Sequence, residues 1–291
     1  MLQSIKANAQ DFEVILQKAL SYNSIAAKQL ENAVHYSVLG GGKRFRPFLV
    51  RLVADLYNVN KELALNASVA IELIHCYSLV HDDLPAMDDD DLRRGQPTTH
   101  KKYDEATAIL AGDILQTMAF SHLLRLNLSQ QKIIALSQCL TIASQDMVSG
   151  QMLDMQAETK DANELTLKDI QQIQRLKTGA IIAASAKFGA ILGNASNEEQ
   201  KNIYQWGLEL GEAFQISDDL LDMYGSEEKA GKRLQKDDDH GKVTFVTLLG
   251  AKGAKERVLQ LQQSAAQRLA KYGNKADNLN GLWQWLIARD F

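Results

Sequence analysis

Proline is scarce in this chain, and its distribution limits what the chain can fold into. The three prolines are Pro47, Pro85 and Pro97, so the remainder of the 291-residue sequence contains none. Proline lacks a backbone donor and clashes with the preceding turn, so a long stretch without it can continue in long helices. Residues 167–192 and 199–224 are rich in Ala, Leu, Ile, Gln, Lys and Glu. We therefore predict an all-α fold.

The sequence contains no obvious domain boundary. Breaks in the helical pattern at residues 58–60, 194–197 and 225–241 are too short and too ordinary in composition to be interdomain linkers. There is no internal repeat and no low-complexity tract. We expect one domain over residues 1–291.

Composition excludes several classes of function. The net charge of −4 gives no basic face for nucleic acid. No apolar stretch of signal-peptide length precedes Asp11 and Glu13, and the longest apolar run, residues 180–192, is too short to span a bilayer. Cys76 and Cys139 lack metal-binding spacing. We expect a cytoplasmic protein with reduced thiols, without membrane insertion and without a nucleic-acid partner.

Two aspartate clusters stand out, and the first reads DDLPAMDDDD over residues 82–91. Carboxylates this close repel one another unless a divalent cation neutralises them. Residues 71–82 have a helical pattern that puts His75, Ser78 and Asp82 on one face. Pro85 should end this helix near Leu84 and let the chain bring Asp88 back towards Asp82.

The second cluster, DDLLD at residues 218–222, follows the same logic. Gln215, Asp218, Asp219 and Asp222 are spaced i, i+3, i+4 and i+7, so they form an acidic stripe on an otherwise apolar helix. Burying such a stripe is unfavourable without a ligand.

Solvated surface is the competing interpretation for runs of aspartate, and it is favoured for residues 89–91 and 237–239. An EF-hand fits poorly, because the D-x-D-x-D-G loop with its closing glutamate is absent.

Five motifs together resemble the short-chain trans-polyprenyl diphosphate synthases, and most closely the bacterial farnesyl diphosphate synthases. They run in order from about residue 30 to the C-terminus: GGGKRFRP (40–47), HDDLPAMDDDDLRRG (81–95), KTG (177–179), FQISDDLLD (214–222) and the lysines of GKR and HGK. The resemblance implies the isoprenoid synthase fold, a single-domain bundle of long helices around a central active-site cavity.

The resemblance also implies a reaction. The enzyme would condense isopentenyl diphosphate with dimethylallyl and geranyl diphosphate to give (2E,6E)-farnesyl diphosphate and diphosphate in isoprenoid biosynthesis. Three Mg²⁺ ions, for which Mn²⁺ could substitute, would clamp the leaving diphosphate. By this resemblance Asp82 and Asp88 bind metal directly with Asp83 alongside. Asp218 supplies the opposing side, with Asp222 and Asp219 as outer or water-mediated partners.

The remaining candidate site residues are also assigned by resemblance. The allylic diphosphate would be held by Arg93, Lys177, Lys232 and the nearby Lys242, and the metal-free isopentenyl diphosphate by Lys43, Arg46, His75 and Arg94. Thr178 and Gln215 would direct their oxygens at the carbocation, and the released diphosphate would take the proton. Gln151 and Asp154 resemble a further polar pair in the cavity, and a pair on a helix surface is the equal alternative. For the other residues the alternatives are ordinary surface cations and a core histidine at His75.

Product length is assigned to Tyr77, the fifth residue before Asp82 and about 7.5 Å along a helix from it. Its ring could floor the cavity at a fifteen-carbon chain, whereas Ser78 is too small to do so. An ordinary core aromatic is the alternative, and Met118 is the next candidate for the floor.

Some positions depart from the family pattern. Val243 and Val246 predict an altered loop geometry without loss of class, and the acidic run 236–239 either weakens diphosphate affinity or faces water. A homodimer is implied, with residues 110–124 as an interface or an ordinary core helix. Competing functions are a geranylgeranyl or geranyl diphosphate synthase, a terpene cyclase, a non-catalytic subunit that alters product length, and an acidic cation buffer. The GGGKRFRP loop and Arg94 argue against the cyclase, and the complete acidic motifs argue against the subunit.

Overall fold

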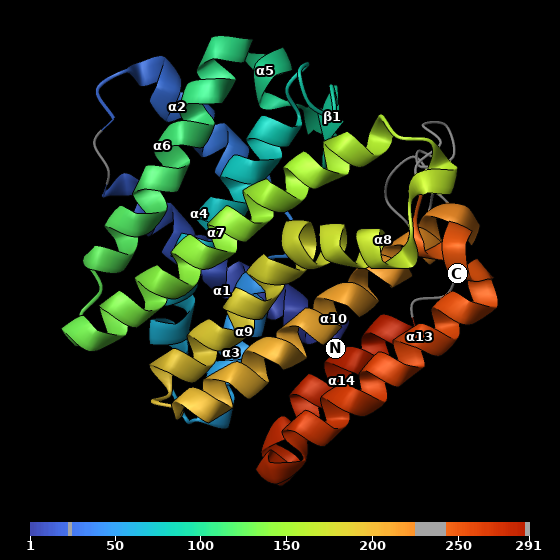
Figure 1. The fold of residues 1–291 in the computed structure, drawn as a ribbon. Helices are drawn as coiled ribbons and strands as arrows, with labels where there is room; N and C mark the ends of the chain where they lie inside the picture. Colours follow the sequence, from blue (N-terminus) through green and yellow to red (C-terminus); the bar gives the residue numbers. More distant parts are fainter. Residues whose placement is uncertain (23–24, 225–242, 289–291) are drawn as a thin grey trace.

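The protein, seen here as a computed structural model, is described over residues 1–22, 25–224 and 243–288, and helices dominate those ranges (Figure 1). This confirms the predicted all-α fold. The long helices are α1 (Leu2–Ser21), α2 (Lys28–Leu39), α3 (Phe45–Leu56), α4 (Lys61–Asp82), α6 (Glu105–Leu124), α7 (Gln130–Glu158), α9 (Ala180–Leu192), α10 (Asn197–Tyr224), α13 (Phe245–Leu269) and α14 (Asp277–Ile287). The shorter elements are β1 (Leu92–Arg93), β2 (Gln96–Pro97), α5 (Thr99–Lys102), η1 (Ala162–Glu164), α8 (Leu167–Gln174), η2 (Arg175–Gly179) and η3 (Ala270–Ala276).

Local sequence explains where α4 begins and ends. The side-chain oxygen of Asn60 accepts hydrogen bonds from the backbone N–H groups of Glu62 and Leu63, which caps the first turn. The helix ends at Asp82, three residues before Pro85, as the sequence predicts. The predicted breaks near residues 58 and 194 are also confirmed, because Asn58 and Asn194 adopt left-handed backbone conformations there.

Residues 167–192 are helical, but they do not form one regular helix. The π-helical turn η2 separates α8 from α9. Turns of this kind are rare and are frequent at functional sites. The composition of the segment predicts helix and gives no indication of the widened turn.

The interior consists of two apolar clusters that meet at α3 and α9. Helices α1, α2, α4, α6 and α7 supply most of the first cluster, and α10, α13 and α14 most of the second. In α9, Ile181 and Phe188 face the first cluster while Ile182 and Ala186 face the second. A helix that is apolar on every side is expected at such a central position.

Helix α4 is the one element, within the ranges described, that is long and apolar enough to cross a membrane. However, 72% of the relevant window is buried inside the protein. The helix packs closely against α6 and also contacts α1, α3 and α9. It is therefore a core helix, and its C-terminal end carries the first acidic motif. In Figure 1, α6 and α7 cover one side of the bundle, while α13 and α14 lie against α10 on the other.

Candidate active site

The first acidic motif folds back on the end of α4. The backbone N–H of Asp88 donates to the carbonyl oxygen of Asp82 at 2.9 Å, and the N–H groups of Met87 and Asp89 donate to the Leu84 carbonyl. This confirms the prediction that Pro85 lets the chain return Asp88 to Asp82. The two aspartates therefore lie close together at the end of the helix.

Asp82 is a carboxylate whose charged form is disfavoured by burial. Burial, together with the like charges of Asp88 and Asp83, raises the pKa of Asp82 to about 6. Lys177 and Arg93 oppose this rise without cancelling it. Such a carboxylate is stabilised in its charged form by an added cation.

Asp83, the neighbouring residue, is held in a different way. Its side chain is buried and paired with Arg93, whose Nε donates to Asp83 Oδ1 at 2.9 Å. Arg93 Nη2 also contacts Asp83 Oδ1, and it reaches Asp90 Oδ2 at 3.1 Å. The structure thus ties Asp83, assigned from the sequence as a companion of the metal ligands, to a guanidinium.

Asp89 and Asp91 lie at the surface, as the sequence favours, whereas Asp90 is half-buried and paired with Arg93. Asp89 and Asp91 are exposed, and Lys101 Nζ lies 2.8 Å from Asp91 Oδ1 and 4.0 Å from Asp89 Oδ1. Lys101 is itself partly exposed, so these pairs contribute little stability. They give Asp89 and Asp91 surface surroundings that differ clearly from those of Asp82.

The second acidic motif projects from α10, and its members have different surroundings. Asp219 is buried and accepts hydrogen bonds from Gln215 Nε2 at 2.8 Å and from the backbone N–H of Phe245 at 3.1 Å. It thereby joins α10 to the first turn of α13, a favourable position for an anion. Asp222 is also buried, and its Oδ1 has no hydrogen-bond partner among the residues that the structure describes. Asp218 is half-buried.

Gln215 is oriented by this arrangement. Because its Nε2 donates to Asp219, its Oε1 is left to face other groups. Sequence reasoning treated Asp219 as an outer metal partner. The i, i+4 spacing within α10 could have signalled the hydrogen bond to Gln215. The hydrogen bond to Phe245 depends on two helices meeting, and no local pattern signals that contact.

The π-helical turn η2 presents Lys177 and Thr178. Lys177 Nζ donates to Asp154 Oδ2 of α7 at 2.6 Å, and the Thr178 hydroxyl lies 3.4 Å from Gln174 Oε1. Gly150 of α7 packs directly under this turn, since a Cβ there would lie only 2.2 Å from the Lys177 backbone nitrogen. Sequence reasoning missed Gly150, although a glycine inside a long apolar helix is a usable signal of close approach.

Gln151 and Asp154 are both buried, so the interpretation of them as a pair on a helix surface is wrong. Asp154 is bonded to Lys177, and both side-chain polar atoms of Gln151 are buried without a partner. Gln151 therefore has hydrogen-bonding capacity left for another group.

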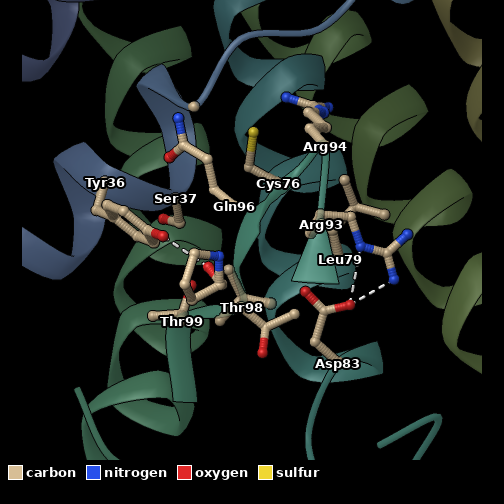
Figure 2. A pocket seen from close by; sticks show the side chains of 13 residues that line it. Tyr36, Ser37, Cys76, Leu79, Asp83, Arg93, Arg94, Gln96, Thr98 and Thr99 are labelled. Carbon is tan, nitrogen blue, oxygen red and sulfur yellow. Dashed lines mark hydrogen bonds and ion pairs between the residues drawn. The ribbon is translucent and has the colours of Figure 1, made fainter. Parts of the chain in front are cut away.

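A β-hairpin with a two-residue turn directs the side chains of Arg93 and Arg94 to different places. Leu92 pairs with Pro97 and Arg93 with Gln96, so Arg94 and Gly95 form the turn with positive φ angles. Figure 2 shows Arg93 directed at Asp83 while Arg94 extends away from it. Arg94 Nη1 donates to the Gly41 carbonyl, on the loop before α3. The pocket in Figure 2 is lined by this hairpin, by α2 and by α4.

Four arginines surround His75. Burial and the positive charges of Arg46, Arg94, Arg44 and Arg93 lower the pKa of His75 well below its ordinary value. His75 is thus a neutral ring at neutral pH and offers hydrogen bonds rather than charge. Arg46 Nε is buried without a hydrogen-bond partner, and Lys43 is exposed. This concentration of cations would favour an anion.

Tyr77 lies deep in the first apolar cluster. It is buried, its ring packs edge-on against His81 at 5.9 Å between centroids, and its hydroxyl is 3.2 Å from Ser144 Oγ of α7. Ser78 is half-buried, and its hydroxyl donates to the His75 carbonyl of its own helix. Met118 of α6 is buried in the same cluster.

Several candidate residues lie outside the ranges that the structure describes, namely Lys232, Lys242 and Asp237–Asp239. Val246 lies in the first turn of α13 and is buried in the second cluster, beside the cap formed by Thr244. Val243 packs against the same cluster.

The acidic side chains do not form a closed metal site by themselves. Within residues 1–22, 25–224 and 243–288, no three His, Cys, Asp or Glu side chains are grouped closely enough to hold a metal ion. Burial nevertheless raises the pKa of Asp82, and Asp222 Oδ1 has no hydrogen-bond partner among the described residues, so an added cation would stabilise both carboxylates. Oxygen ligands of this kind fit a hard divalent cation.

The fold and the site together define a helical protein that sets buried carboxylates beside a cluster of arginines. Comparisons with known proteins specify the class further. The polyprenyl synthetase family model matches residues 27–280. The chain is 44% identical over 247 residues to a farnesyl diphosphate synthase of Haemophilus influenzae, covering 83% of each chain. It is 38% identical to geranylgeranyl pyrophosphate synthase 4 of Arabidopsis thaliana, covering 90% of this chain and 71% of the relative.

A solved structure agrees with these sequence matches. The crystal structure of a geranyltransferase from Legionella pneumophila has a TM-score of 0.86 and 38% identity, covering 99% of this chain and 97% of that one. The chain therefore belongs to the polyprenyl synthetase family. It has the isoprenoid synthase fold and is a prenyltransferase.

Proposed function

We propose that this protein is a Mg²⁺-dependent farnesyl diphosphate synthase formed by one domain over residues 1–291. It condenses isopentenyl diphosphate with dimethylallyl and then geranyl diphosphate. The observation that carries the proposal is the opposite character of two adjoining sites. Asp82 and Asp88, which lie together at the end of α4, would form an acidic opening, and Arg46 and Arg94, whose charges act on His75, would form a basic one.

Magnesium would be held by Asp82 and Asp88 from one side and by Asp218 and Asp222 from the other. The acidic opening fits this ion because burial disfavours the charged form of Asp82, and because Asp222 Oδ1 has no hydrogen-bond partner among the described residues. We expect three ions, with Mn²⁺ able to substitute. When bound, they would neutralise the negative charge that develops on the leaving diphosphate.

The chain's own residues carry the remaining tasks. Lys177 and Arg93 hold the allylic diphosphate, and Asp154 and Asp83 orient these two cations through the ion pairs already described. The Thr178 hydroxyl and Gln215 Oε1 stabilise the allylic carbocation through their dipoles. The proton lost after carbon–carbon bond formation goes to the released diphosphate.

Isopentenyl diphosphate occupies the basic opening without metal. Arg46 and Arg94 provide guanidinium groups, which suit phosphate oxygens, and Lys43 adds a point charge. His75 is neutral because of the arginines around it, so it can donate a hydrogen bond without adding to their repulsion.

Tyr77 sets the product length at fifteen carbons. Its buried ring and its contact with Ser144 give the rigid floor that such a limit requires. The alternative is a geranylgeranyl or geranyl diphosphate product. The Arabidopsis relative keeps the twenty-carbon alternative open.

A homodimer formed through α6 and α7 completes the proposal. On α7 the exposed residues between 133 and 153 are all uncharged, and they include Ile134, Ile142, Val148 and Met152. Leu110 and Leu124 of α6 are also exposed. An apolar face of this length favours burial against a second copy. We place the dimer in the cytoplasm, without membrane insertion and without nucleic acid.

The deciding experiment is product analysis by mass spectrometry. The protein is mixed with Mg²⁺, isopentenyl diphosphate and dimethylallyl diphosphate, and we expect mainly farnesyl diphosphate. A cyclic hydrocarbon would indicate a terpene cyclase. Absence of any condensed product at saturating Mg²⁺, with both substrates bound, would favour the non-catalytic subunit. Calorimetric binding of cations without diphosphate binding would favour a cation buffer.

A further inference from the structure

Arg44 lies between two proposed substrate ligands, Lys43 and Arg46, but it faces the interior. It is 2% exposed, whereas Lys43 is exposed to solvent. Its backbone is left-handed, with φ of 48°, at the residue that precedes α3. A residue other than glycine adopts this conformation at an energetic penalty, so its surroundings must hold it there.

The Arg44 guanidinium is bonded to three separate elements. Nε donates to Glu13 Oε1 of α1 at 2.7 Å, Nη1 donates to Glu72 Oε1 of α4 at 2.9 Å, and Nη2 donates to the Val38 carbonyl at the end of α2 at 2.7 Å. All three nitrogens have a partner. Arg44 is therefore unavailable to a substrate in this arrangement, and it fixes the loop that carries the residues on either side of it.

Glu72 connects this network to the basic opening. It lies one helical turn before His75 on α4 and is buried with its second oxygen, Oε2, unpartnered. Its charge also acts on Arg46, where it favours the charged form. Glu13 and Glu72 supply two negative charges, one more than the single positive charge of Arg44. The charge of Arg46 offsets the excess. Arg46 and Arg94 are the cations that the proposed function assigns to isopentenyl diphosphate.

We propose that Arg44, clamped by Glu13 and Glu72, is a positioning residue that sets the loop at residues 40–46 for isopentenyl diphosphate. Through Glu13, helix α1 becomes part of the substrate site. The matched family segment begins at residue 27, so α1 lies outside it. The inference rests on the proposed function for the identity of the anion.

Substitution of Glu13 gives the mildest test, because its side chain is 30% exposed and lies at the edge of the network. Glu13→Gln keeps the shape and removes the charge. We expect the KM for isopentenyl diphosphate to rise about three- to tenfold, while kcat and the KM for the allylic substrate stay within about twofold. Arg44→Lys keeps the positive charge but loses the forked guanidinium that bonds three partners, so we expect the KM for isopentenyl diphosphate to rise about ten- to a hundredfold.

Helix α1 offers a matched control. Asp11 Oδ2 lies 2.5 Å from Lys61 Nζ, and this pair joins α1 to the start of α4, away from the loop. Asp11→Asn therefore removes a carboxylate from the same helix without touching Arg44. It should leave both KM values unchanged, and the melting temperatures of Asp11→Asn and Glu13→Gln should be similar.

Calorimetric titration with isopentenyl diphosphate in the absence of metal separates this inference from the proposed function. If the wild type does not bind or condense isopentenyl diphosphate, the proposed function is wrong. If the wild type does both and Glu13→Gln binds equally tightly, or if Asp11→Asn and Glu13→Gln weaken binding to the same extent, Arg44 and α1 have no positioning role. A selective loss in Glu13→Gln and Arg44→Lys supports it.

Discussion

One short hairpin contributes an arginine to each of the two proposed openings. The acidic opening is made of carboxylates, and the basic opening is made of arginines. The pKa of Asp82 is raised mainly because the carboxylate is buried, with Asp88 and Asp83 adding to the rise and Lys177 and Arg93 opposing it. The pKa of His75 is lowered mainly by burial and further by the positive charges of the nearby arginines. The hairpin turn sends Arg93 to the first and Arg94 to the second. The acidic opening is therefore suited to an added cation, and the basic opening is suited to an added anion.

Removal of Asp82 should have the largest effect on this contrast. Asp82→Ala and Asp218→Ala should each lower kcat by about two to four decades, because each removes a ligand for metals that act on the leaving diphosphate. Steady-state turnover at saturating Mg²⁺ measures this loss. The matched control is Asp89→Ala, since Asp89 is an exposed aspartate of the same run. Equal losses in all three variants would contradict the division into site and surface carboxylates.

Substitution of the two hairpin arginines tests whether the two openings bind different substrates. Arg94→Ala should raise the KM for isopentenyl diphosphate more than that for the allylic substrate, and Arg93→Ala should show the reverse bias. Hydrogen bonds to charged groups contribute about 1.5–3 kcal/mol, so each selective change should be about ten- to a hundredfold. Kinetics with each substrate varied in turn tests the bias. If both variants raise the two KM values equally, the assignment of Arg93 and Arg94 to separate substrate sites is wrong.

Product length should depend on neither opening. Tyr77→Ala should extend the main product from fifteen to twenty or more carbons, since each buried methylene contributes about 0.8 kcal/mol in an opened cavity. Chromatography of the dephosphorylated products gives the distribution. Tyr77→Phe keeps the ring and loses the contact with Ser144, so it should still stop mainly at fifteen. If the product distribution of Tyr77→Ala is unchanged, Tyr77 does not limit the product length, and Met118 becomes the candidate.

The smallest effect should be on the pH dependence of metal-free stability. Because the folded-state pKa of Asp82 is raised to about 6, the folded protein retains this proton after the unfolded chain has lost it. Asp82 therefore makes the protein less stable as pH rises from about 4 to about 6. Asp82→Asn should gain melting temperature relative to the wild type over that window. A difference that is constant from pH 4 to pH 7 would show that Asp82 has an ordinary pKa.

The sequence alone determined the features that depend on local chemistry. The absence of proline after Pro97 allowed long helices, and Pro85 ended α4 where Asp88 could return to Asp82. Both follow from steric limits on the backbone within a few residues. The five motifs also identified the family that the comparisons later showed.

The tertiary structure decided which groups satisfy one another across helices. It paired Asp83 with Arg93, set Asp219 against the first turn of α13, and buried Asp154 beside Lys177. It also turned Arg44 inward from a loop where every neighbouring cation is a candidate ligand. These contacts join residues far apart in the chain, so they depend on how whole helices pack. Periodicity and spacing describe one helix at a time and contain no information about its partner.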